Sequence, residues 1–97
     1  MTSNLRTLAA HCNFTLGTAV TKEPYFFTDP TYRQIHADNF NLCVPANAMK
    51  CGSICAQPNQ YDFSRADAFV DFATQHNQAI RGHTLCWTHS ADQSSFL

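Results

Sequence analysis

Short apolar runs alternate along the chain with stretches that carry helix signals. The apolar runs predict strands at residues 14–20, 40–44 and 79–85. A short helix is predicted at residues 5–11, and longer helices are predicted from Asp29 to about Asn39 and from Ser64 onwards. Because strands that alternate with helices are typical of βαβ units, the pattern predicts an α/β fold with parallel strands.

The two longer helices have recognisable starts. Asp29 is suited to the N-cap position, and Pro30 is suited to the first helical position, where its missing N–H costs nothing. Ser64, followed three residues later by Asp67, has the capping pattern of a second helix start. Inward-facing residues are expected at Tyr32, Ile35 and Ala37 in the first helix, and at Ala66, Phe69, Val70 and Ala73 in the second.

Two segments between these elements are predicted to be loops. Residues 21–28 contain Pro24 and three aromatic residues, and Phe26 and Phe27 carry no specific signal for function. Pro45 ends the second strand, and the loop at residues 52–62 contains a Gln-Pro-Asn-Gln turn. No repeat, low-complexity tract or linker interrupts the chain, so one domain is expected.

The third predicted strand ends in a cluster of polar and aromatic side chains, Arg-Gly-His-Thr-Leu-Cys-Trp at residues 81–87. In α/β barrels, ligand-binding groups lie where the strands end on their carboxyl side. His83 and Trp87 are therefore candidate residues of a site that binds a sugar.

This segment resembles glycoside hydrolase family 10, the endo-β-1,4-xylanases. Further matches follow in the family's order: residues 14–20 resemble its first barrel strand, 29–33 its first helix, 47–50 its sugar-binding segment and 62–73 the helix before residues 81–87. Separated blocks in the right order are a more specific signal than any one short motif.

The resemblance implies an α/β fold that is part of a TIM (β/α)₈ barrel. A complete barrel needs about 250 residues, so 97 residues supply about its first three βα units. We expect residues 1–97 to form a single partial-barrel domain, in which 1–89 resemble the N-terminal region of a xylanase and 90–97 are a polar tail. Unpaired strand edges then predict self-association or a complementing barrel chain as partner.

Part of the family's glycone-side sugar site is implied at four positions. Asn47 and Lys50 match polar residues that hydrogen-bond a sugar two units from the cleaved bond, His83 matches a histidine that contacts the sugar at that bond, and Trp87 matches the aromatic beside it. Amide and ammonium groups suit sugar hydroxyls, whereas an indole covers a sugar face. The implied ligand is xylan or a xylo-oligosaccharide.

The same segments depart from the family's pattern. Ala46 stands where the family has Glu, which removes about 1–3 kcal/mol of charge-assisted hydrogen bonding. Cys51 stands where the family has an aromatic residue, and Thr-His-Ser at residues 88–90 is shifted, so no role is carried over to it. These departures predict a weakened sugar site.

Hydrolysis with retention needs two carboxylates about 5–5.5 Å apart across the scissile bond. The single glutamate of this chain, Glu23, lies in a predicted loop. Five aspartates lie at helix starts or on exposed helix faces: Asp29, Asp38, Asp62, Asp67 and Asp71. In the family both catalytic glutamates lie further along the chain, on the fourth and seventh strands. The resemblance therefore implies no catalytic residue here, no cofactor, and no hydrolysis of xylan by this chain alone.

Composition excludes some partners. Six Lys and Arg against seven Asp and Glu give a formal charge of −1, so no basic surface for nucleic acid is expected. No apolar run is long enough for a membrane span, and the N-terminus lacks the apolar core of a signal peptide. The chain as written is expected to be cytoplasmic, although members of the family are mostly secreted.

Two other interpretations remain open at this stage. The chain can be a non-catalytic interaction or structural module that associates through exposed strand edges.

Five cysteines exclude a complete disulfide set, and Cys43, Cys55 and Cys86 lie in or beside apolar segments as small core residues. Alternatively, Cys51, Cys55, Cys86 and His89 supply four ligands to a structural zinc, although their spacings are not the usual ones. His11, His36 and His76 are expected in surface or boundary packing.

Overall fold

The computed structural model describes residues 4–86, which form five helices and three strands. In chain order these are α1 (Leu5–His11), β1 (Gly17–Val20), α2 (Glu23–Thr28), α3 (Pro30–Asn39), β2 (Leu42–Pro45), α4 (Cys51–Ile54), α5 (Ser64–Gln75) and β3 (Ala79–Ile80). No helix within residues 4–86 is both long and apolar enough to cross a membrane.

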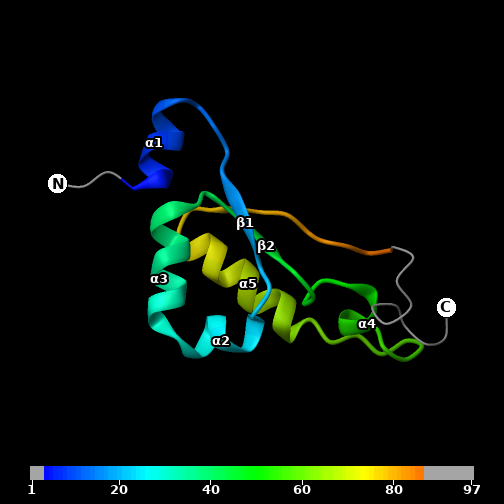
Figure 1. Cartoon of the computed structure of the whole chain (residues 1–97). Helices are drawn as coiled ribbons and strands as arrows, with labels where there is room; N and C mark the ends of the chain where they lie inside the picture. Colours follow the sequence, from blue (N-terminus) through cyan, green and yellow to red (C-terminus); the bar gives the residue numbers. More distant parts are fainter. Residues whose placement is uncertain (1–3, 87–97) are drawn as a thin grey trace.

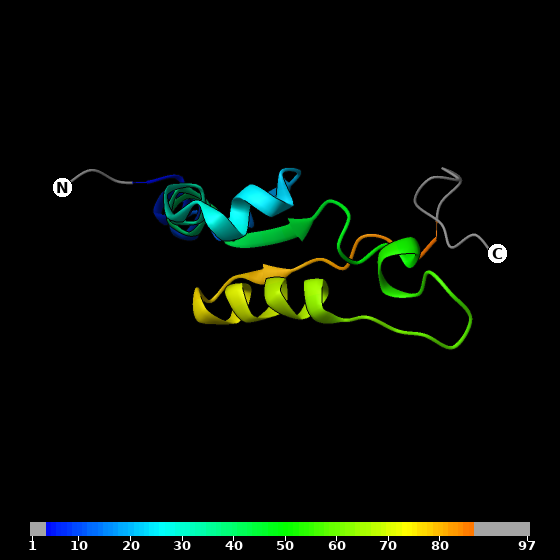
Figure 2. The same ribbon diagram turned by 90° about the horizontal axis from the view of Figure 1, so that it is seen from below.

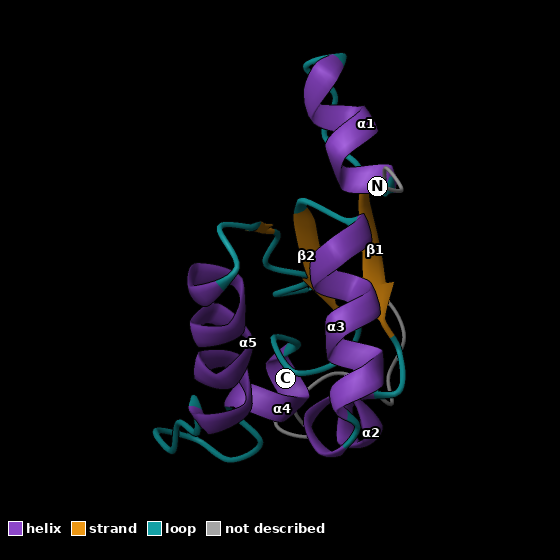
Figure 3. Ribbon diagram, turned by 90° about the vertical axis from the view of Figure 1, so that its left-hand side faces the viewer, coloured by secondary structure: helices purple, strands orange, loops and turns teal. Residues whose placement is uncertain are grey.

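The strands described within residues 4–86 form one parallel sheet in the order β1-β2-β3, which confirms the predicted α/β fold. Gly17 pairs with Leu42, and Leu42 pairs in turn with Ala79. Helices α3 and α5 lie on the same face of the sheet (Figures 1 and 3). Each strand is shorter than its apolar run, because only part of each run pairs with a neighbouring strand.

The carboxyl ends of β2 and β3 continue side by side beyond the sheet. Arg81 N, directly after β3, donates to Cys43 O of β2 at 3.0 Å. A methyl group built on Gly82 would lie 3.8 Å from Sδ of Met49. The segments that follow the two strands are thus neighbours, at the opposite end of the molecule from α1 (Figures 1 and 2).

The core is built around the ring of Phe26, which is fully buried. Its centroid lies 5.1 Å from that of Tyr32 on α3, and 5.5 Å and 4.8 Å from those of Phe69 and Phe72 on α5. Phe26 belongs to α2, so the prediction of a loop at residues 21–28 is wrong. Proline is tolerated in a first helical turn, and burial of the Phe26 ring stabilises this short helix.

In both longer helices, some of the buried residues differ from those expected. On α3, Ile35 is 55% exposed, whereas the neighbouring His36 is buried. On α5, Val70 is 40% exposed, whereas Phe72 is buried with Phe69 and Ala73. The predictions for Ile35 and Val70 are therefore wrong, because contact with Phe26 sets the rotation of each helix.

The start of α3 is confirmed and the start of α5 is corrected. Asp29 caps α3 by accepting from Thr31 N at 3.0 Å. Ser64 is instead the first residue of α5, and its N and Oγ donate to Asp62 at 2.9 Å and 2.6 Å. These two hydrogen bonds lower the pKa of the Asp62 carboxyl.

His36 is enclosed by the core, so the expectation of surface or boundary packing is wrong for this residue. The centroid of its ring lies 5.5 Å from that of Phe26, and its Nδ1 lies 3.1 Å from Nε2 of Gln78. Burial lowers the pKa of His36, His76 lowers it further, and backbone hydrogen bonds oppose this. Since Gln78 Nε2 is a donor, Nδ1 accepts and the neutral ring carries its proton on Nε2.

The first prediction concerns Gly17. A Cβ at this position would lie 2.7 Å from Cβ of Leu42, so a methyl group forces β1 away from β2. We expect Gly17→Ala to lower the free energy of unfolding by about 1–3 kcal/mol in urea titrations followed by circular dichroism. The matched control is Gly82→Ala, whose methyl has ordinary contacts; equal losses in both variants would contradict the prediction.

The second prediction concerns His36. The unfolded chain binds a proton on this histidine near pH 6.5, whereas the folded chain does so only at lower pH, so stability falls as the pH drops below about 7. In His36→Phe this fall should be shallower by up to about 1.4 kcal/mol per pH unit. Urea unfolding at several pH values measures it. Equal slopes in the parent chain and in His36→Phe would refute the prediction.

Candidate functional site

The segment after β2 forms a tight turn, residues 46–50, that leads into α4. Lys50 N donates to Asn47 O at 3.1 Å, which closes the turn. Lys50 O then accepts from Ser53 N at 2.9 Å and from Ile54 N at 3.1 Å. The turn therefore has a defined backbone geometry at the carboxyl end of the sheet, where α/β barrels carry their binding groups.

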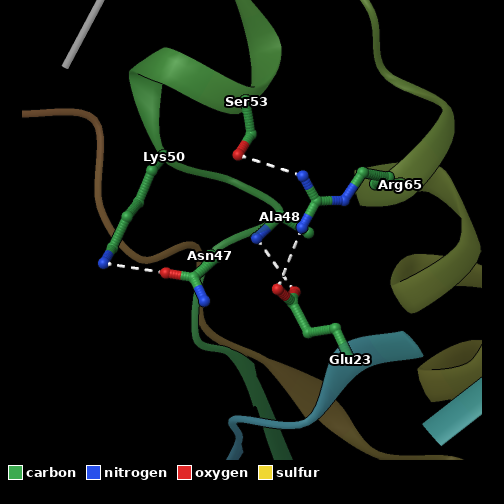
Figure 4. Close-up of polar contacts among 6 residues, drawn as sticks. All are labelled: Glu23, Asn47, Ala48, Lys50, Ser53 and Arg65. Atoms are coloured by element: carbon green, nitrogen blue, oxygen red, sulfur yellow. Dashed lines mark hydrogen bonds and ion pairs between the residues drawn. The ribbon is translucent and has the colours of Figure 1, made fainter. Parts of the chain in front are cut away.

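Two of the predicted site residues meet in this turn. Lys50 Nζ donates to Asn47 Oδ1 at 3.1 Å, and Lys50 is only 9% exposed (Figure 4). The contact places an ammonium group and an amide side by side. Groups of this kind hydrogen-bond ring hydroxyls of a sugar.

The other two predicted residues belong to the segment after β3. His83 is exposed, and its neighbour Gly82 lies against Met49 of the turn. Trp87 lies outside the described residues 4–86. The structure thus brings Asn47 and Lys50 into contact and places the chain around His83 alongside their turn.

Beneath the turn lies an ion pair that the sequence did not indicate. The Glu23 carboxylate accepts from Ala48 N through Oε2 at 2.9 Å and from Arg65 Nη2 through Oε1 at 3.1 Å. Arg65 Nη1 also donates to Ser53 Oγ at 3.3 Å. The Glu23 side chain is 6% exposed, whereas that of Arg65 is 54% exposed (Figure 4).

Sequence reasoning placed Glu23 in a loop, but it is the first residue of α2. The local signal that could have indicated its place is Pro24, since proline is frequent in a first helical turn. The partner Arg65 is 42 residues away along the chain, so no local pattern connects the two. Only the fold of α2 and α5 against the sheet brings them together.

The cysteines range from buried to exposed, and Cys51 and Cys55 are half-buried. Cys43 is fully buried as expected, and burial raises its thiol pKa to about 11. Cys86 is exposed, so the expectation of a core position is wrong for it. Residues 4–86 hold no group of three or more His, Cys, Asp or Glu side chains placed for a metal. His89 lies outside this range, and the zinc site stays a prediction.

Parallel strands in the order β1-β2-β3, with helices on one face and polar side chains at the carboxyl ends, are the arrangement found in part of an α/β barrel. The family model of Glycosyl hydrolase family 10 matches residues 4–96. The chain belongs to this family.

Its relatives include an exoglucanase and endo-1,4-beta-xylanases by name. The chain is 42% identical to Exoglucanase XynX of Acetivibrio thermocellus over 74 residues, which cover 76% of this chain and 7% of that protein. It is 36% identical to Endo-1,4-beta-xylanase A of Xylanibacter ruminicola over 83 residues, which cover 86% of this chain and 22% of that protein.

Solved structures of this family superpose on the chain. Xylanase 10B from Thermotoga petrophila RKU-1, in complex with xylobiose, matches with a TM-score of 0.87 and 30% identity over 99% of this chain and 29% of that one. Native xylanase 10B from Thermotoga maritima matches with a TM-score of 0.85 and 28% identity over 96% of this chain and 28% of that one. The chain thus forms part of a TIM barrel and spans less than a third of these proteins.

Proposed function

We propose that this chain carries part of a xylan-binding site, corresponding to the N-terminal part of an endo-1,4-β-xylanase. The observation that carries the proposal is the contact between Asn47 and Lys50 at the carboxyl end of β2, two positions that match the family's glycone-side residues. His83 and Trp87 complete the proposed site from the segment after β3. The relative solved with xylobiose supports a sugar of this class as ligand.

The proposed site binds weakly, since the glutamate that precedes this asparagine in the family is replaced by Ala46. Lost charge-assisted hydrogen bonds of this kind cost about 1–3 kcal/mol. Cys51 likewise stands where the family has an aromatic residue, which removes a surface for the face of a sugar ring.

The chain on its own is proposed to lack hydrolytic activity. Glu23, its one glutamate, is turned toward Ala48 and Arg65 and is almost fully buried. Asp29 and Asp62 accept backbone N–H groups at the starts of α3 and α5, and Asp38 accepts from Gln34. These carboxylates serve the fold, whereas retaining hydrolysis needs two facing a substrate.

The third prediction tests sugar binding. In an NMR titration of the 97-residue chain with xylotriose, we expect saturable shifts confined to Asn47, Lys50, His83 and the Trp87 indole. Asn47→Ala and Lys50→Ala should each weaken binding about tenfold or more, because each removes hydrogen bonds to sugar hydroxyls. Gln34→Ala, which changes an exposed residue on α3, is the control. Chemical shifts that do not change when xylotriose is added would rule out the proposed site.

The fourth prediction tests hydrolysis. We expect the purified chain to release no reducing sugar from xylan above a no-protein blank, since it lacks the pair of carboxylates. A catalytically competent family member assayed in parallel provides the positive control. Activity that persists through purification and disappears in Glu23→Gln would overturn the proposal.

Exposed strand edges favour a second function, that of an association module. Within residues 4–86, β1 and β3 are the outer strands of the sheet, each paired only with β2. Outer strands present backbone groups that pair with another chain. Light scattering distinguishes the cases: a defined oligomer that does not bind xylotriose supports association, and a monomer that binds the sugar supports the proposed site.

A further inference from the structure

We infer that Glu23 is a positioning residue for the sugar site: its carboxylate, held by Arg65, fixes the turn that presents Asn47 and Lys50. The inference rests on the proposed function, because it assigns a role in sugar binding to a residue that touches no sugar. Glu23 comes from α2, which lies below the turn in the view of Figure 4, and its carboxylate points toward the turn's backbone.

The hydrogen bond to Ala48 acts on the peptide group that follows Asn47. A trans peptide group is planar, and its N–H and C=O point in opposite directions. Glu23 accepts the N–H of Ala48 at 2.9 Å, while the C=O of Asn47 accepts from Lys50 N at 3.1 Å. The peptide plane between Asn47 and Ala48 is therefore held from both sides, which fixes the direction in which the Asn47 side chain leaves the backbone.

Because the Ala48 amide is buried, the position of the turn depends on this hydrogen bond. Ala48 is 1% exposed, so its N–H is shielded from solvent in the present turn and has the Glu23 carboxylate as its acceptor. Loss of the acceptor therefore favours rotation of the peptide group toward solvent. That rotation displaces Asn47 and lengthens its contact with Lys50 Nζ.

Arg65 stabilises the Glu23 carboxylate in this position through an ion pair. It neutralises a side chain that is 6% exposed and whose charge would otherwise be unpaired. Through Ser53 Oγ it also connects to α4, which begins directly after Lys50. The turn is thus held at its middle by Glu23, and the helix that follows it is held by Arg65.

A purely structural role would predict a different result. Asp29 provides the comparison, because it also accepts backbone N–H groups, at the start of α3, but does not touch the turn. If Glu23 acts only on stability, Glu23→Ala and Asp29→Ala should alter sugar binding equally. If Glu23 positions the turn, only Glu23→Ala should weaken binding.

The experiment uses the 97-residue chain with Glu23→Ala, Glu23→Gln and Asp29→Ala, at a temperature where each is folded. We expect Glu23→Ala to speed hydrogen exchange of the Ala48 amide about tenfold or more relative to the core amides, and to weaken xylotriose binding by a similar factor. Glu23→Gln keeps an acceptor oxygen and should fall between Glu23→Ala and the parent chain. Asp29→Ala should leave both quantities within about twofold of the parent.

The outcomes separate this inference from the proposed function. Unchanged Ala48 exchange in Glu23→Ala, or equal losses of binding in Glu23→Ala and Asp29→Ala, would overturn the positioning role. If Glu23→Ala does not fold, the same comparison between Glu23→Gln and Asp29→Ala decides the question. If the parent chain fails to bind xylotriose, the proposed function fails and this inference with it, whereas the exchange of Ala48 still reports whether Glu23 holds the turn.

Discussion

The ring of Phe26 joins parts of the molecule that no strand pairing connects. It is fully buried and packs against Tyr32 of α3 and against Phe69 and Phe72 of α5. Burial of a large aromatic ring is among the strongest single contributions to a small core. Because Phe26 follows Glu23 by three residues, the packing that fixes this ring also fixes where the Glu23 carboxylate lies. The core and the candidate site therefore depend on the same short helix.

Local signals predicted much of the fold. The N-cap at Asp29 and the proline after it located α3, and the alternation of apolar runs with helices predicted the parallel sheet. Helix α2 escaped prediction because six residues are too few to show a helical period, and its stability comes from tertiary contacts of Phe26. The same contacts turned His36 and Phe72 inward, in place of Ile35 and Val70.

Resemblance indicated Asn47 and Lys50, and the structure adds a second pair of residues beside them. Asn47 and Lys50 lie three residues apart, so a short match to the family was enough to indicate them, and the structure adds their direct contact. Glu23 and Arg65 are separated by 42 residues and come from different helices. A pair of this kind is created by the packing of α2 and α5, which no spacing in the sequence expresses.

The order of the sheet has a consequence for how the chain folds as it is made. Within the described residues each strand pairs with its neighbour in sequence, and the buried core consists of residues between Val20 and Ala73. These pairings, like the contacts of Phe26 with Phe69 and Phe72, join distant parts of the chain, so they form only once the connections between the strands have been made. During synthesis the core is complete once α5 has left the ribosome. Within the described residues the outer edge of β3 is then unpaired and presents backbone groups with which another strand can pair.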